Sequence, residues 1–365
     1  MRIVLFDTIL ERHLAQSLKR SLEALGHDVV FTDLILHGHS MISKPGDIKL
    51  IQKHIDEVLS YPTDLFIAFR PMNLLANMVK EISKKTKTAI WLSDDPVLYK
   101  TCYKDVIDSY DIVLHCGNEK VMDFYFSKGH KAGFNFPFWT DEIAFPPVYL
   151  KNTIEYDGIF LGNMHGQVRH RRYLEISKVP ANIKVFGLVD SDPFGMHGGF
   201  IRDGYQDTEL VSEVLSKAKF AISIPQFFSD YKGLAEYEFD ELTSLGYFQF
   251  PSRIIQYASS GLPIVAVGKS DMLEVFPEIY IADNVEGLYE EIDKLTNDRV
   301  YAENKSKKIL KRFNSNCNKL FYKNIRILGS FLSGLFSYSC FCPLLPTLNS
   351  AFPCRNSPRV MSTKQ

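Results

Sequence analysis

The residues best suited to chemistry stand at the start of a short helix in the second half of the chain. Ser252 and Arg253 open this expected helix, and Gln256 follows one turn later on nearly the same face of an otherwise apolar segment. A helix N-terminus beside a fixed cation favours phosphate, and a side-chain amide can hydrogen-bond a ribose hydroxyl. Pro251 and Gly261 are typical of the start and the end of such a helix. The pattern predicts a nucleotide site, and its alternative is a capped, half-buried helix without a ligand.

A second candidate site follows the expected strand 158–161. Gly162 and Asn163 come directly after this strand, and Arg169 and Arg172 stand three residues apart in the helix that comes next. Glycine lets the backbone approach a ligand closely, and residues three apart share a helix face. These features predict a cradle for a diphosphate. A basic, solvent-facing helix start is the equally weighted alternative.

Two candidates for catalysis lie at strand ends in the first half of the chain. Asp95 follows the expected strand 88–92, where a carboxylate could deprotonate an acceptor hydroxyl in an inverting reaction. The alternative role for Asp95 is a helix N-cap with Pro96 in the first turn. His115 ends the next expected strand, where it could contact a donor phosphate or an acceptor. We therefore take Asp95, His115 and Arg253 as the candidate catalytic residues.

Residues 250–265 resemble, in order and spacing, the nucleotide-sugar-binding motif of B-type (GT-B, two-Rossmann) glycosyltransferases. The loop at Gly162 with its nearby arginines resembles the spore-maturation-protein type of glycosyltransferase-like proteins. The chain departs from the motif at three positions. Arg253 stands where many members have lysine, and Gln256 stands where they usually have glutamate. Phe248 occupies the spacing at which many retaining members carry an acidic residue.

The resemblance implies a hexosyltransferase-like enzyme that moves a sugar from a nucleotide-diphosphate sugar to an acceptor. The acceptor class it implies is a cell-surface glycan or its precursor, including lipid-linked ones. Arg253, with the loop at Gly162 and Asn163, would neutralise the leaving diphosphate, and Gln256 would hold the ribose. The same resemblance places the nucleobase near Gly187, with Tyr205 available for stacking, although loop tyrosines more often pack on their own domain.

Apolar runs alternate with amphipathic helical stretches along the whole chain. This alternation predicts an α/β fold in which two Rossmann-like domains with parallel sheets face a cleft. Ligands in such sheets bind outside the carboxyl ends of the strands. The expected division is an acceptor-side domain at 1–140, a linker at 141–156, a nucleotide-sugar-binding domain at 157–320, and a tail at 321–365.

Composition and absent motifs exclude several other classes. At 365 residues the chain is long enough for two domains, and its formal net charge of −1 provides no overall attraction to nucleic acid. A GxGxxG dehydrogenase fingerprint and a GxxxxGK[ST] loop are both absent from the sequence. The six cysteines show no zinc-type spacing, and the pattern Asp190-Ser191-Asp192 is more typical of a turn than of a metal site. We expect no metal and no cofactor beyond the donor itself.

The two ends of the chain differ in character. The N-terminal residues read as a first strand without a signal peptide, which predicts a cytoplasmic protein. No charged residue occurs from Ile327 to Cys354, and Lys319, Lys323 and Arg326 lie just before this stretch. A basic helix that leads into an apolar stretch can dock at the inner face of a membrane. A poorly ordered tail and a helix packed across the first domain are the alternatives.

Two rival functions share the expected architecture. A sugar-nucleotide epimerase would isomerise the donor without an acceptor. A catalytically silent nucleotide-sugar-binding module is the other rival, and the glutamine at position 256 is its best support.

Overall fold

The computed structural model describes most of the chain up to residue 332. The described residues are 1–7, 12–33, 45–69, 74–92, 96, 99–117, 119–131, 133–149, 153–164, 167–187, 189–199, 208–225, 251–268 and 275–332. For residues 167–170, 316–332 and a few at element ends, the structure describes the backbone alone.

The first half of the chain forms a six-stranded parallel sheet in the order β2-β1-β3-β4-β5-β6. Its strands are β1 (Arg2–Asp7), β2 (Asp28–Asp33), β3 (Leu65–Phe69), β4 (Lys87–Leu92), β5 (Ile112–His115) and β6 (Phe134–Asn135). Its helices are α1 (Arg12–Ala24), α2 (Pro45–Val58), α3 (Ala76–Ser83) and α4 (Glu119–Ser127), with a π-helical turn η1 (Tyr99–Tyr103) and a 3-10 turn η2 (Ile107–Ser109). Helices on both faces bury the apolar strands, as expected for a parallel sheet.

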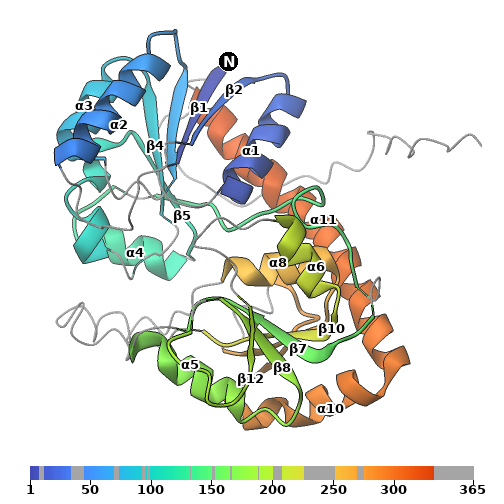
Figure 1. Ribbon diagram of the computed structural model, residues 1–365. Helices are drawn as coiled ribbons and strands as arrows, with labels where there is room; N and C mark the ends of the chain where they lie inside the picture. The colour runs from blue at the N-terminus through green and yellow to red at the C-terminus, as the bar shows by residue number, and fades with distance from the viewer. Residues whose placement is uncertain are drawn as a thin grey trace, which may run out of the picture.

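The second half repeats this plan with the strand order β12-β11-β10-β7-β8-β9, again parallel throughout. The strands are β7 (Tyr156–Leu161), β8 (Ile183–Phe186), β9 (His197–Gly199), β10 (Ala218–Ser223), β11 (Ile264–Val267) and β12 (Tyr280–Ala282). The helices are α5 (Gln167–Ser177), α6 (Thr208–Leu215), α8 (Ser252–Ser260), α10 (Tyr289–Asn297) and α11 (Arg299–Leu332), with a 3-10 turn η4 (Glu286–Leu288) before α10. Figure 1 shows the two sheets as separate layers with the helices around them. The predicted α/β architecture with two Rossmann-like halves is confirmed.

Residues 139–145, in the segment between the two sheets, form hydrogen bonds with both halves of the chain. Arg20 of α1 binds Asp141 through both carboxylate oxygens, at 2.7 and 2.8 Å, and the indole of Trp139 donates to the Leu14 carbonyl. On the other side, the Ser259 hydroxyl donates to the Phe145 carbonyl. One apolar core runs from the first sheet through residues 136–148 to α8. The linker is therefore a packed connection between α1 and the end of α8.

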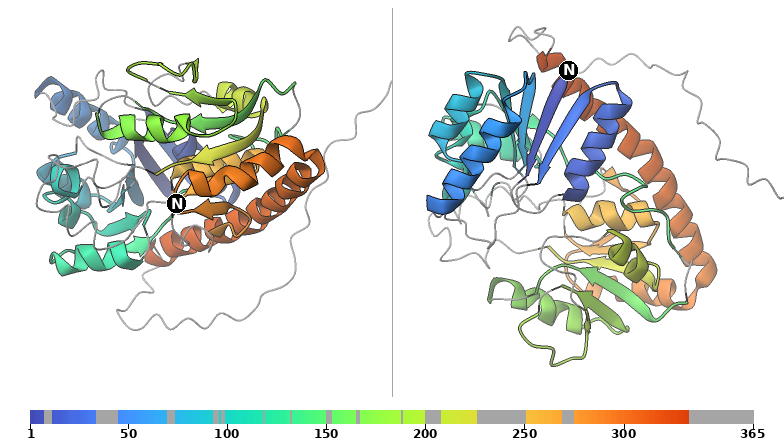
Figure 2. Two further views of the ribbon diagram at one scale, coloured as in Figure 1. Left: turned by 90° about the horizontal axis from the view of Figure 1, so that it is seen from below. Right: turned by 45° about the horizontal axis from the view of Figure 1, so that its top comes forward.

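Helix α11 extends across the position at which the sequence places the start of a separate tail. The expected division begins the tail at 321, whereas α11 runs without a break to Leu332. The two views agree that its later turns return to the first domain, beside α1 and β1 (Figures 1 and 2). No proline interrupts residues 299–332, so nothing in this stretch forces the helix to stop. Among the described helices, none combines the length and the hydropathy needed to cross a bilayer.

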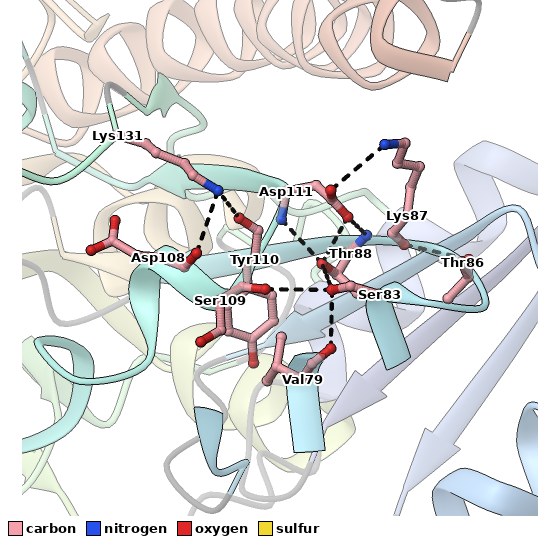
Figure 3. A network of polar contacts seen from close by, with 10 residues as sticks. All are labelled: Val79, Ser83, Thr86, Lys87, Thr88, Asp108, Ser109, Tyr110, Asp111 and Lys131. Carbon is pink, nitrogen blue, oxygen red and sulfur yellow. Dashed lines mark hydrogen bonds and ion pairs between the residues drawn. The ribbon is translucent and has the colours of Figure 1, made fainter. Parts of the chain in front are cut away.

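A polar network fixes the amino-terminal ends of β4 and β5, away from the carboxyl edge of the first sheet (Figure 3). The Asp111 carboxylate accepts hydrogen bonds from the backbone N–H of Thr88 at 2.9 Å and from its hydroxyl at 3.0 Å. The Thr88 hydroxyl in turn accepts from the Asp111 backbone N–H, and it lies 3.1 Å from the Ser83 hydroxyl. Thr88 is fully buried, so these bonds replace the water that its polar groups lost on folding.

We expect Asp111→Ala to lower the free energy of unfolding by about 1–3 kcal/mol, because it leaves the buried Thr88 donors without their acceptor. Asp123→Ala is the matched control, since it removes an exposed carboxylate from α4 and should change stability by about 0.5 kcal/mol or less. Urea denaturation measures both variants. Equal effects would mean that the network does not stabilise the first domain.

Candidate functional site

Helix α8 begins and ends as its sequence predicts. Pro251 precedes the helix in an extended conformation, with φ of −73° and ψ of 143°. Gly261 ends it in the left-handed region at a φ of 80°, and a Cβ at this position would lie 2.9 Å from Leu310. The cap thus requires glycine both for its backbone angle and for space. The first turn of α8 carries Ser252 and Arg253.

The centre of the candidate site is the ring of Phe160, near the carboxyl end of β7. The guanidinium carbon of Arg253 lies 4.5 Å from the ring centroid, and that of Arg172 lies 5.4 Å from it. Both cations are attracted to the negative face of the ring. Arg172 is only 3% exposed, whereas Arg253 is partly exposed. The structure therefore holds two positive charges, from α5 and α8, against one aromatic side chain.

Arg253 reaches this ring by crossing the edge of the second sheet. Phe160 packs in the core on the α5 side together with Tyr173, while the apolar side chains of α8 belong to the core on the opposite side. On the way, the Arg253 Nη1 donates to the Ile224 carbonyl at 3.3 Å, just beyond β10. The guanidinium is thus placed at the carboxyl end of the sheet, where parallel α/β sheets bind their ligands.

Two glycines make room for this crossing. A Cβ at Gly162 would lie 3.2 Å from Nη2 of Arg253 and 3.1 Å from the Phe160 ring. A Cβ at Gly187 would lie only 2.4 Å from the Gly162 carbonyl oxygen and 3.1 Å from the Asn163 nitrogen. Both glycines have positive φ, at 143° and 151°, which side chains rarely tolerate. The backbone at 162–163 is therefore packed between Gly187 and the guanidinium.

Tyr257 supports the strand end beneath the two arginines. Its hydroxyl oxygen accepts a hydrogen bond from the Leu161 backbone N–H at 2.7 Å. Burial raises the pKa of Tyr257 to about 12, while the positive charges of Arg253 and Arg172 act in the opposite direction. The phenol therefore stays neutral at physiological pH and adds no negative charge beside the two arginines.

The structure brings together Gly162, Asn163, Gly187, Arg172 and Arg253 among the predicted ligand-binding residues. Ser252 is partly exposed in the first turn of α8, and Gln256 is buried at 1% exposure one turn later.

Three predicted residues cannot be placed in this arrangement. Asp95 and Tyr205 lie outside the described residues, and Arg169 belongs to α5 with its side chain outside the description.

His115 is in a different position from the one predicted. Its side chain is fully buried in the first domain, with its ring centroid 4.7 Å from that of Tyr125. A Cβ at Gly133 would lie 2.2 Å from the His115 ring, so the absent side chain at 133 provides the space that the ring occupies. Its position at a strand end suggested contact with a donor phosphate or an acceptor, whereas the structure buries the His115 ring inside the first domain.

The acidic pattern at 190–192 forms a turn. The Asp192 carboxylate accepts hydrogen bonds from the backbone N–H groups of Met196 at 2.8 Å and His197 at 3.1 Å, and from the Tyr173 hydroxyl. Partial burial acts to raise the pKa of Asp192, but these hydrogen bonds outweigh it and the pKa is lowered. Within the described part of the chain, no group of three or more His, Cys, Asp or Glu residues is placed to hold a metal ion.

Sequence analysis missed Phe160 and Tyr257 as members of the site. Phe160 lies inside an apolar strand and resembles any other core residue in sequence. Tyr257 belongs to the motif at 250–265, but its hydroxyl contact with Leu161 connects residues 96 positions apart.

A second feature of this domain is a cavity of about 350 Å³ between α6 and the β8–β9 edge, lined by Tyr156, Phe186, Gly199 and Val214 among others.

Comparisons with known proteins support the architecture. No protein-family model and no curated protein sequence matches the chain. Several solved structures do match. T4 phage BGT in complex with its UDP-glucose substrate is 13% identical, covers 90% of this chain and 99% of its own, and has a TM-score of 0.55. A glycosyltransferase from Rickettsia africae is 13% identical over 91% of this chain and 98% of its own, with a TM-score of 0.57. The trehalose 6-phosphate synthase of Burkholderia multivorans is 8% identical over 92% and 99%, with a TM-score of 0.56.

The chain has the GT-B glycosyltransferase fold. The predicted resemblance to two-Rossmann glycosyltransferases is thereby confirmed at the level of architecture. At identities of 8–13%, the similarity shows the fold alone.

We expect Gly187→Ala to lower the free energy of unfolding by about 2 kcal/mol or more, because its Cβ meets the Gly162 carbonyl and its φ is unfavourable for alanine. Gly195→Ala is the matched control, since Gly195 also has a positive φ, at 64°, but no atom lies within 4 Å of its Cβ position. The control should cost about 1 kcal/mol. Thermal denaturation compares the two, and a control as destabilised as Gly187→Ala would contradict the close approach of residues 162 and 187.

Proposed function

We propose that this protein transfers a sugar from a nucleotide-diphosphate sugar to the hydroxyl group of an acceptor. The observation that carries the proposal is the pair of guanidinium groups, from Arg172 and Arg253, held on the Phe160 ring at the carboxyl edge of the second sheet. A pair of fixed cations beside a glycine loop and a helix N-terminus suits a diphosphate. Structures of the same fold that contain UDP-glucose support the choice of a sugar nucleotide.

The proposed chemistry breaks the bond between the sugar carbon C1 and the diphosphate oxygen. Negative charge develops on the leaving diphosphate as this bond breaks, and the acceptor oxygen forms the new bond to C1. Arg253, Arg172 and the first turn of α8 supply positive potential where that charge appears. Stabilisation by prearranged charges requires little reorganisation during the reaction, which makes it effective.

Other residues have supporting roles in the proposal. Gln256 holds the ribose from the second turn of α8, and Tyr205 stacks on the nucleobase beyond Gly187. Asp95, three residues after the end of β4, removes the acceptor proton if the reaction inverts configuration. His115 has no part in it, because its ring lies in the first-domain core.

The acceptor class we propose is a glycan or a glycan precursor. Among the structures of this fold, one is described as a lipopolysaccharide outer core galactosyltransferase and another as a DNA-modifying β-glucosyltransferase. The formal net charge of −1 favours the first class over the second, because duplex DNA attracts proteins mainly through its phosphates.

We expect UDP to bind the wild-type chain and Arg253→Ala to weaken that binding by about tenfold to 100-fold, since a hydrogen bond to a charged group contributes about 1.5–3 kcal/mol. Arg171→Ala is the matched control, because Arg171 neighbours Arg172 on α5 but is exposed. Its affinity for UDP should stay within about twofold of the wild type. Calorimetric titration measures both variants, with GDP, CDP and dTDP tested in parallel to identify the base.

Turnover distinguishes the proposal from its rivals. Release of UDP from UDP-glucose in the presence of a glycan acceptor supports transfer. Conversion of the donor to an isomer without an acceptor would indicate an epimerase, and binding without either reaction would indicate a silent module. Absence of binding by all four diphosphates would contradict the nucleotide site itself.

The ribose role of Gln256 has a separate test. We expect Gln256→Leu, a substitution of similar size, to lower the affinity for UDP by about fivefold to tenfold, because it removes one net hydrogen bond of about 1 kcal/mol. Inorganic pyrophosphate has no ribose, so its affinity should not change. Equal losses for UDP and pyrophosphate would show that residue 256 acts only through the folding of α8.

A further inference from the structure

Helix α11 carries a large net positive charge. Its 34 residues contain nine lysines and arginines and a single glutamate, a net formal charge of +8 in a chain whose total is −1. At 1.5 Å per residue, the helix is about 50 Å long. Because the total for the chain is −1, acidic residues elsewhere in the sequence balance this charge.

One side of α11 is buried against the protein and the opposite side is exposed. Ala302, Ile309 and Phe313 are buried, with Ile309 and Phe313 in the core that includes α8. Lys307, Lys308 and Lys311 are exposed. Residues that differ by three or four positions share a helix face, so 302, 309 and 313 lie on one side while 307, 308 and 311 lie on the other. Figure 2 shows α11 along the outside of the molecule.

The three exposed lysines differ from the other cations of the described part of α11 in their ion pairing. Three other cations of α11 form ion pairs: Arg299 lies 2.8 Å from Glu303, Lys305 lies 3.0 Å from Glu291, and Arg312 lies 3.0 Å from Glu278. Within the part of the chain that the structure describes, Lys307, Lys308 and Lys311 form no ion pair. We call these three residues the lysine stripe. Lys319, Lys323 and Arg326 continue the basic sequence along the same helix.

We propose that the lysine stripe docks this protein on an anionic phospholipid surface. Each lysine or arginine near such a surface contributes independently to binding, so several on one helix face give useful affinity. The choice of a membrane over a nucleic acid rests on the sequence that follows, because no charged residue occurs from Ile327 to Cys354. A bilayer can bind both a cationic helix face and an apolar segment of the same chain. Nucleic acid would bind the lysines through its phosphates but offers no comparable site for the apolar segment.

The proposal does not depend on the proposed transferase activity. None of the stripe residues belongs to the Arg172–Arg253 site, which lies on α5, β7 and α8. A variant of the stripe can therefore lose membrane binding while it keeps the affinity for UDP, and the two proposals can fail separately.

The test is flotation of the full-length protein with lipid vesicles. We expect binding to vesicles made of phosphatidylcholine and phosphatidylglycerol in equal parts, no binding to phosphatidylcholine alone, and release at raised salt. The combined variant Lys307→Gln, Lys308→Gln and Lys311→Gln should lower the vesicle partition coefficient by about 100-fold, from the contribution of each lysine. Lys49→Gln, Lys85→Gln and Lys104→Gln together form the matched control, because they remove the same charge from exposed positions of the first domain.

Several results would overturn the proposal. The wild type could fail to bind the anionic vesicles, or the control variant could lose as much vesicle binding as the stripe variant. Equal binding to phosphatidylcholine alone would indicate that apolar insertion, and not charge, holds the protein on the bilayer. Tighter binding of a duplex DNA through the same three lysines would assign the stripe to nucleic acid instead. Thermal denaturation of both combined variants verifies that they remain folded.

Discussion

The attraction of two guanidinium groups to one aromatic ring is the interaction on which the candidate site depends. Arg172 approaches Phe160 from α5, and Arg253 approaches it from α8 across the end of the sheet. Two like charges beside the same ring repel each other, and burial of Arg172 removes the water that would screen them. The ring and the core around it hold both cations in place at the carboxyl end of the second sheet.

Helix α8 connects this site to the boundary between the domains. Its first turn carries Arg253, and its last turn binds the linker, because the Ser260 carbonyl accepts hydrogen bonds from the N–H groups of Val148 at 3.0 Å and Tyr149 at 3.2 Å. Its apolar side chains belong to the core that continues into the first domain. The position of the cation at the sheet edge is thus determined by the same helix that sets how the linker leaves the second domain.

Local features of the site could be predicted from the sequence, and contacts distant in sequence could not. The start and end of α8 follow from proline and glycine preferences, and Gly162 and Gly187 stand out as glycines directly after apolar strands. The role of Phe160 depends on two helices that approach it from different sides of a sheet. The periodicity of the sequence contains no information on such a contact. The burial of His115 could not be predicted for a related reason, because the space for its ring comes from Gly133, on the neighbouring β6 side of the sheet.

A crystal structure of the wild-type protein with UDP is the decisive experiment for the nucleotide site. We predict that the diphosphate lies within hydrogen-bonding distance of the Arg253 guanidinium and of the backbone at Gly162 and Asn163, near the first turn of α8. A diphosphate bound elsewhere, for example in the cavity between α6 and the β8–β9 edge, would contradict it. Such a result would mean that Arg172 and Arg253 hold the second sheet together without binding the donor.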